Sequence, residues 1–115
     1  MAHRSPFQDY HREEMQRIGT GTGKGVRFGT LNVGSMTGKG REVAGMLRKR
    51  AVEVCCVQET RWKGGSARMI GEGYKLFYAG EASGRNGVGV IVSESVKDGV
   101  VEVKRQNSRM MVVRL

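Results

Sequence analysis

Two apolar runs flank one amphipathic segment in the first half of the chain, and this arrangement constrains the fold more than any other feature. Residues 26–33 and 52–57 have the apolar, β-branched character of strands. The segment between them places Val43, Met46 and Leu47 at helical spacing. Such a strand–helix–strand unit returns the chain to one sheet, so we expect parallel strands and a right-handed crossover. The second run is almost entirely apolar, which predicts a strand buried on both faces.

The second half of the chain is built of short strand-like runs. They cover residues 74–78, 88–92, 100–105 and 110–115. The dipeptide Asn86-Gly87 precedes one of them and is a strong hairpin signal. Consecutive strands with short links predict an antiparallel meander. The whole pattern therefore predicts an α/β domain with a mixed sheet, in which a strand–helix–strand unit leads into antiparallel strands.

Two local features predict further details of the helices. Thr37 precedes the amphipathic segment, so we expect it to cap that helix. Residues 66–70 are interpreted as a short second helix, against which Trp62 could pack.

The ends of the chain differ from its middle. Residues 1–25 are polar and end in a glycine-rich run, which predicts a flexible leader with at most one helical turn at residues 12–18. Residues 110–115 are apolar and no turn signal follows them. A sheet edge this apolar needs a further strand or a covering helix. We therefore expect residues 26–115 to be a partial domain, truncated at its C-terminus.

The chain of 115 residues carries a formal net charge of +9. Residues 26–50 alone hold six Lys or Arg against one Glu. Such a balance favours a nucleic-acid partner over an anionic membrane surface, although a solvated basic helix face gives the same pattern. No N-terminal stretch has the length of a signal peptide or membrane span, which predicts an intracellular protein, nuclear or cytoplasmic, with no membrane partner.

The cysteines and histidines exclude several kinds of chemistry. Cys55 and Cys56 are neighbours on a strand and point to opposite faces, so we expect two small buried thiols rather than a disulfide. His3 and His11 both lie in the leader, which excludes histidine-based catalysis and a His/Cys metal cluster in the folded part. The Gly-Lys pairs at residues 23 and 38 lack the rest of a phosphate loop, so we expect no small-molecule cofactor.

Asn32 and Glu59 each end one strand of the parallel pair. The carboxyl edge of such a sheet is where α/β folds place their sites. Glu59 is a hard oxygen ligand of the kind Mg²⁺ prefers, and the Asn32 amide could orient a phosphate or a neighbouring ligand. Two plainer alternatives stay open. Glu59 could form an exposed ion pair with Arg61 or Lys63, and Asn32 could satisfy its own turn.

The segments after the strands supply candidate nucleic-acid contacts. Arg61, Trp62 and Lys63 combine positive charge with an aromatic face directly after Glu59. Arg85 and Asn86 in the later hairpin are a second candidate for contact with a nucleic-acid backbone.

Four sequence runs together resemble the endonuclease/exonuclease/phosphatase superfamily. They are TLNVGSM (30–36), VQETRWKG (57–64), GEGYKL (71–76) and RNGVGV (85–90). The similarity is greatest to the apurinic-type endonuclease domains of RTE-like non-LTR retrotransposons, whose host-genome relatives are often labelled craniofacial development protein 2-like. The resemblance implies a four-layer α/β sandwich and hydrolysis of DNA phosphodiester bonds with Mg²⁺ or Mn²⁺. It also implies that Glu59 binds the metal and that Asn32 contacts the phosphate or the metal network.

The chain departs from that family in its later motifs. The family brings an aspartate-x-asparagine pair and a terminal aspartate–histidine pair, whereas the aspartates here are Asp9 and Asp98. Gly34 stands where some relatives carry a metal-linked acid. We therefore expect the N-terminal half of the sandwich, inactive alone, with a possible need for a partner that supplies the other half.

Two other hypotheses fit the same residues. The chain could be a basic nucleic-acid-binding module without chemistry, or a translated retroelement remnant without function. The module would bind through the cations Arg48, Lys49, Arg50, Arg61 and Lys63.

Overall fold

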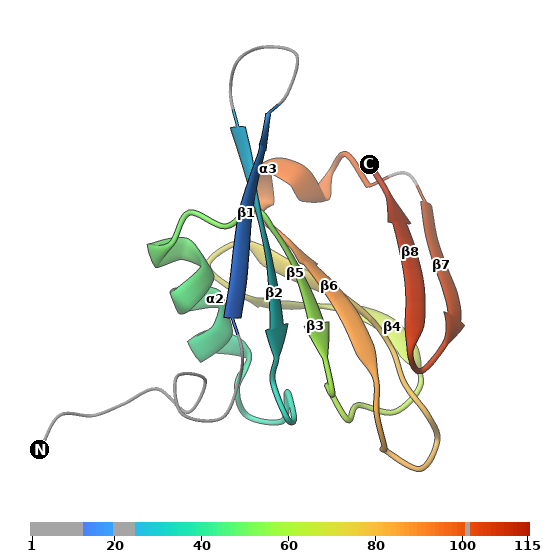
Figure 1. Ribbon diagram of the computed structural model, residues 1–115. Helices are drawn as coiled ribbons and strands as arrows, with labels where there is room; N and C mark the ends of the chain where they lie inside the picture. The colour runs from blue at the N-terminus through green and yellow to red at the C-terminus, as the bar shows by residue number, and fades with distance from the viewer. Residues whose placement is uncertain (1–12, 20–24, 101) are drawn as a thin grey trace, which may run out of the picture.

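The computed structural model describes residues 13–19, 25–100 and 102–115 and is built around one six-stranded sheet (Figure 1). The strand order is β1-β2-β3-β6-β5-β4, and β7 and β8 form a separate two-stranded sheet. The elements in chain order are β1 (Glu13–Gly19), β2 (Gly25–Asn32), α2 (Gly40–Lys49), β3 (Val54–Gln58), β4 (Gly65–Gly71), β5 (Tyr74–Ala79), β6 (Val88–Val92), α3 (Glu94–Lys97), β7 (Glu102–Asn107) and β8 (Met110–Arg114).

The predicted strand–helix–strand unit is present as β2, α2 and β3. The two strands are parallel, and Asn32 at the end of β2 is the register partner of Gln58 at the end of β3. Val43 and Leu47 of α2 are fully buried, while Met46 is partly buried against the same core. The apolar stripe seen in the sequence therefore faces the sheet, as its spacing predicts.

The sheet has two faces with different covers. On one face, α2 packs over side chains from β2, β3, β5 and β6, and Leu31, Val57 and Leu76 are among the residues buried there. On the other face, β7 and β8 lie across a smaller core that includes Val54 and Val90. Burial on the α2 face is the larger share of the apolar stabilisation, because that core holds more of the fully buried side chains.

The cover on the second face is incomplete. Met110, Val112 and Leu115 are 57%, 45% and 54% exposed. Cys55 is buried on the α2 face, but Cys56 on the opposite face is exposed. The prediction of a strand buried on both faces is therefore wrong at Cys56, because a cavity of about 300 Å³ lies between Cys56 and strand β8.

The expected helix at residues 66–70 is wrong: these residues belong to strand β4. The chain reverses at Glu72 and Gly73, both with positive φ (55° and 81°), and β4 then pairs antiparallel with β5. A tight hairpin turn therefore decides the local structure, and residue periodicity does not reveal it.

Three other expectations need correction. The N-cap of α2 is Lys39 rather than Thr37, whose backbone N–H is instead bonded to Ser35 Oγ (3.2 Å). Residues 13–18 form a strand and not a helical turn, because β1 pairs along β2 and gains hydrogen bonds that one helical turn lacks. The antiparallel strands are split between two sheets and do not form one meander. The rest of the predicted leader, residues 1–12 and 20–24, lies outside the described residues.

Within the part of the chain that the structure describes, no helix is long and apolar enough to cross a membrane.

Candidate metal and nucleic-acid site

The loops that follow β2 and β3 meet at the carboxyl edge of the parallel pair. The Val33 N–H donates to Gln58 O (3.0 Å), and the Met36 N–H donates to Thr60 O (2.9 Å). The Gln58 side chain also donates to Thr30 Oγ1 (3.1 Å). These bonds fix the two strand ends relative to each other. As the sequence predicts, Asn32 and Glu59 are therefore brought to the same edge.

Glu59 has an unusual backbone conformation. Its backbone φ is 57° and that of Arg61 is 58°, values that residues other than glycine rarely adopt. Two backbone bonds from the neighbouring β5–β6 loop hold this shape: Thr60 N–H donates to Gly87 O (3.2 Å) and Arg61 N–H to Asn86 O (2.8 Å). Strained backbone of this kind is concentrated at functional sites.

The Glu59 side chain is exposed at this edge. Among the described residues it makes no ion pair, so the plain alternative of a pair with Arg61 or Lys63 is not formed. The turn that strains the backbone thus presents an unneutralised carboxylate to solvent.

Asn32 is half-buried and its Oδ1 accepts a hydrogen bond from the Gly34 N–H (3.0 Å). The side chain satisfies its own turn, which is the plainer of the two sequence interpretations. A carbonyl oxygen has two lone pairs, so this bond leaves one for a further contact.

The ligand set fits a hydrated Mg²⁺ and does not fit a closed metal cage. Across the described residues, no group of three or more His, Cys, Asp or Glu side chains is placed to hold a metal ion. Mg²⁺ keeps several waters and is commonly bound by one or two carboxylates with phosphate oxygens. Glu59, exposed and without an ion-pair partner in the described part of the chain, matches that requirement.

Thr60 and Gly87 support the site, and the sequence interpretation missed both. Thr60 is fully buried, and its Oγ1 has no hydrogen-bond partner among the described residues. Gly87 has φ +97°, and a Cβ added there would lie 2.3 Å from Thr60 Oγ1. The hairpin signal Asn86-Gly87 was the available clue, because glycine tolerates both the positive φ and this close approach.

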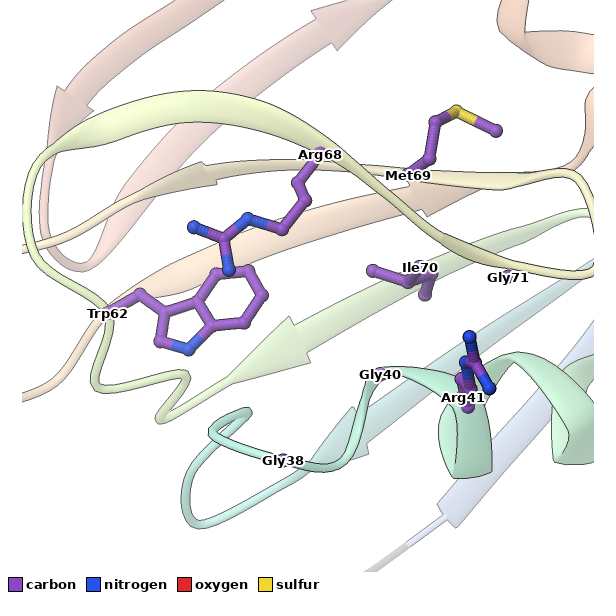
Figure 2. Close-up of a pocket in the computed structure, with 8 residues that line it drawn as sticks. All are labelled: Gly38, Gly40, Arg41, Trp62, Arg68, Met69, Ile70 and Gly71. Carbon is purple, nitrogen blue, oxygen red and sulfur yellow. The ribbon is translucent and has the colours of Figure 1, made fainter.

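Trp62 is partly buried, unlike the exposed Arg61 and Lys63 on either side. Its ring lies edge-on to Tyr78 with centroids 5.0 Å apart, and Arg68 Cζ lies 4.4 Å from the ring centroid. Figure 2 shows the Arg68 guanidinium over the indole. Trp62 therefore packs against β4 and β5, where the sequence interpretation expected a helix.

Arg85 and Asn86, the second predicted group of nucleic-acid contacts, have different surroundings. Arg85 is exposed, but the Asn86 amide donates to Glu81 Oε1 (3.2 Å) and so holds its own loop. Glu81 also accepts from Ser108 Oγ (2.8 Å) and Ser83 Oγ (3.0 Å). These hydrogen bonds, with that of Ser108 the largest cause, lower the pKa of Glu81. Asn86 is thus a structural residue of the site edge.

No family model matches the chain. A search of curated proteins finds similarity to craniofacial development protein 2 from Bos taurus, 31% identical over 89 residues. The match covers 76% of this chain and 15% of that protein, so the chain spans about 15% of the length of its curated relative. The relative carries the label expected from the four sequence runs. Its name says nothing about catalysis.

Proposed function

We propose that this chain forms the N-terminal half of a Mg²⁺-dependent DNA endonuclease domain of retrotransposon type, with the four-layer α/β sandwich as its complete fold. The observation that carries the proposal is the exposed, strained Glu59 beside Asn32 at the carboxyl edge. The similarity to craniofacial development protein 2 agrees with the sequence runs that suggested this family.

Each site residue has a part in the proposed chemistry. Glu59 would hold Mg²⁺ or Mn²⁺, which supplies Lewis-acid stabilisation of charge on the phosphate. The second lone pair of Asn32 Oδ1 would orient a water or ligand near that phosphate. Arg61, Lys63 and Arg85 are exposed cations near the same edge and would contact the DNA backbone.

Among the described residues we assign no group to activate the attacking water. Asp98 is the aspartate among the described residues, and it follows α3 beyond the end of β6. β6 runs from Val88, the register partner of Gln58, to Val92, the partner of Val54. Asp98 therefore lies toward the opposite end of the sheet from Glu59, and we expect no turnover without a further segment or partner chain.

A nicking assay on supercoiled plasmid with Mg²⁺ tests this proposal. We expect the chain to bind DNA without nicking it. Metal-dependent nicking that Glu59→Ala abolishes would contradict the expected inactivity of the chain alone, although it would support Glu59 as the metal ligand. Nicking that survives Glu59→Ala would reject Glu59 as the metal ligand.

A non-catalytic nucleic-acid-binding module is the second candidate. The net charge of +9 and the exposed basic loop around Trp62 favour it. It predicts DNA affinity that falls steeply with salt and does not change with Mg²⁺ beyond ionic strength. Specific Mg²⁺ binding at Glu59 would distinguish the endonuclease half from this module.

A further inference from the structure

A cavity of about 460 Å³ lies between the start of α2 and strand β4 (Figure 2). Trp62 and Arg68 line one side of it, and Gly38, Gly40 and Arg41 line the other. Ile70 and Gly71 close it where the two elements meet, since a Cβ added at Gly40 would lie 3.4 Å from Ile70 Cβ. The volume is within the range of about 300–1,000 Å³ typical of ligand sites.

The cavity lies on the α2 face of the sheet, apart from Asn32. Side chains alternate along β2, and Leu31 points into the core under α2. Asn32, the next residue, therefore projects to the other face. The cavity and the metal edge meet at two loops, the one after β2 that leads to Gly38 and the one after β3 that carries Glu59 and Trp62. Neither Asn32 nor Glu59 lines the cavity, so we expect binding there without a metal at that edge.

The lining is cationic and aromatic. Arg41 and Arg68 are both exposed, and none of the described residues that line the cavity carries a carboxylate. Within the described residues, Arg41 forms no ion pair. Two planar guanidinium groups without a neutralising acid favour an anion with several acceptor oxygens, such as a phosphate.

Arg68 and Trp62 add a stacking platform. The guanidinium carbon lies 4.4 Å from the indole centroid, and the indole is itself supported by Tyr78. Unpaired bases stack on aromatic rings and on guanidinium planes, whereas paired bases are held within a duplex and cannot enter a cavity. The combination fits one nucleotide better than an isolated phosphate.

We infer that this cavity binds an unpaired nucleotide of a single nucleic-acid strand, with its phosphate near Arg41 and its base on the Arg68–Trp62 pair. The site would hold a strand on the α2 side of the sheet edge, apart from any phosphate at Glu59.

Trp62 is the single tryptophan of the chain, so its fluorescence reports on the cavity directly. The test titrates the full chain with single-stranded oligothymidylate, with the matching duplex and with inorganic phosphate. We expect saturable quenching by the single strand, weaker binding of the duplex and no saturation by phosphate. Equal affinity for the duplex would contradict the proposal that the bound nucleotide is unpaired. Saturation by phosphate alone would contradict the proposal that a stacked base is needed for binding.

The variants Arg41→Gln and Arg68→Gln test the two cations. Each should weaken single-strand binding about tenfold, and Arg41→Gln, which removes the phosphate contact, should also reduce the slope of log K against log salt by about 0.7. Arg114→Gln is the matched control, since it removes the same charge from the exposed end of β8. Effects as large in Arg114→Gln would show that only net charge matters. Unchanged binding in both cavity variants would reject the site.

Glu59→Gln separates this site from the proposed endonuclease site. We expect it to keep the quenching by oligothymidylate while losing Mg²⁺ binding. Unchanged oligothymidylate binding in both arginine variants, with Mg²⁺ binding at Glu59 intact, would reject the cavity and leave the proposed function standing. Amide NMR spectra of each variant check that the fold is retained.

Discussion

At the scale of single residues, the chain keeps Glu59 in a conformation that glycine would adopt more easily. A left-handed conformation costs a non-glycine residue roughly 1–2 kcal/mol. Arg61, two residues later, has the same conformation, and both are held by the loop that contains Gly87. The side chain of Glu59 makes no ion pair in the described part of the chain that would offset this cost. The proposed metal-binding role would account for a carboxylate at this position.

Gly87→Ala should destabilise the fold at the site edge. The added Cβ would lie 2.3 Å from Thr60 Oγ1 and 3.1 Å from Arg61 N, at a φ of +97°. We expect the free energy of unfolding to fall by about 2 kcal/mol or more. Urea denaturation followed by Trp62 fluorescence measures it.

Gly45→Ala is the control for that substitution. Gly45 lies inside α2, and a Cβ there would meet nothing within 4 Å. Alanine at this position should raise stability by roughly 0.5–1 kcal/mol. Equal destabilisation by both substitutions would contradict the close packing of Gly87 against Thr60.

At the scale of elements, the first half of the fold could be predicted and parts of the second half could not. β2 and β3 are apolar runs and α2 carries an apolar stripe at helical spacing, and the parallel pairing of β2 with β3 places Asn32 and Glu59 at one edge. The helix expected at residues 66–70 is replaced by β4, because the turn at Glu72 and Gly73 sets this segment against β5. The supporting role of Thr60 depends on contact with Gly87, 27 residues away along the chain, which sequence spacing does not reveal.

The β7–β8 hairpin is attached to the site edge through Glu81. Ser108 Oγ donates to the Glu81 carboxylate, and Gly87 N–H donates to Ser108 O (3.0 Å). The hydrogen bonds lower the pKa of Glu81 below its ordinary value of 4.5. Their stabilisation is therefore fully present above about pH 4.5 and is lost as the pH falls through the lower pKa.

The amide shift of Gly87 measured against pH tests this attachment. We expect it to change in acid, below the ordinary range of a glutamate, as the hairpin turn loosens. Glu81→Gln should remove that step, whereas Glu94→Gln, in the exposed α3, should keep it. A step that persists in Glu81→Gln would assign the titration to another group.

At the scale of the whole molecule, one face of the sheet is well covered and the other is not. α2 buries the larger core, whereas the β7–β8 hairpin leaves Met110, Val112 and Leu115 about half exposed. Exposed apolar surface of this kind promotes association. In the proposed complete domain, a second sheet would cover this face.

Val112→Thr tests whether the exposed face drives association. The change keeps β-branching on β8 but removes apolar surface, so self-association should fall while stability stays within about 0.5 kcal/mol. Val103→Thr, on the same hairpin but packed against the sheet, should instead lower stability by roughly 1 kcal/mol or more. Sedimentation and urea denaturation measure the two effects. Unchanged association in Val112→Thr would show that this face is not the contact surface.

Titration with Mg²⁺ observed by amide NMR tests whether Asn32 and Glu59 form a metal site. We predict saturable shifts at the amides of Asn32 and Glu59, lost in Glu59→Gln and retained in Glu94→Gln, which removes a carboxylate beyond the opposite end of β6. A well-dispersed spectrum without saturable shifts at these residues, or shifts that persist in Glu59→Gln, would contradict a metal site at this edge of the sheet.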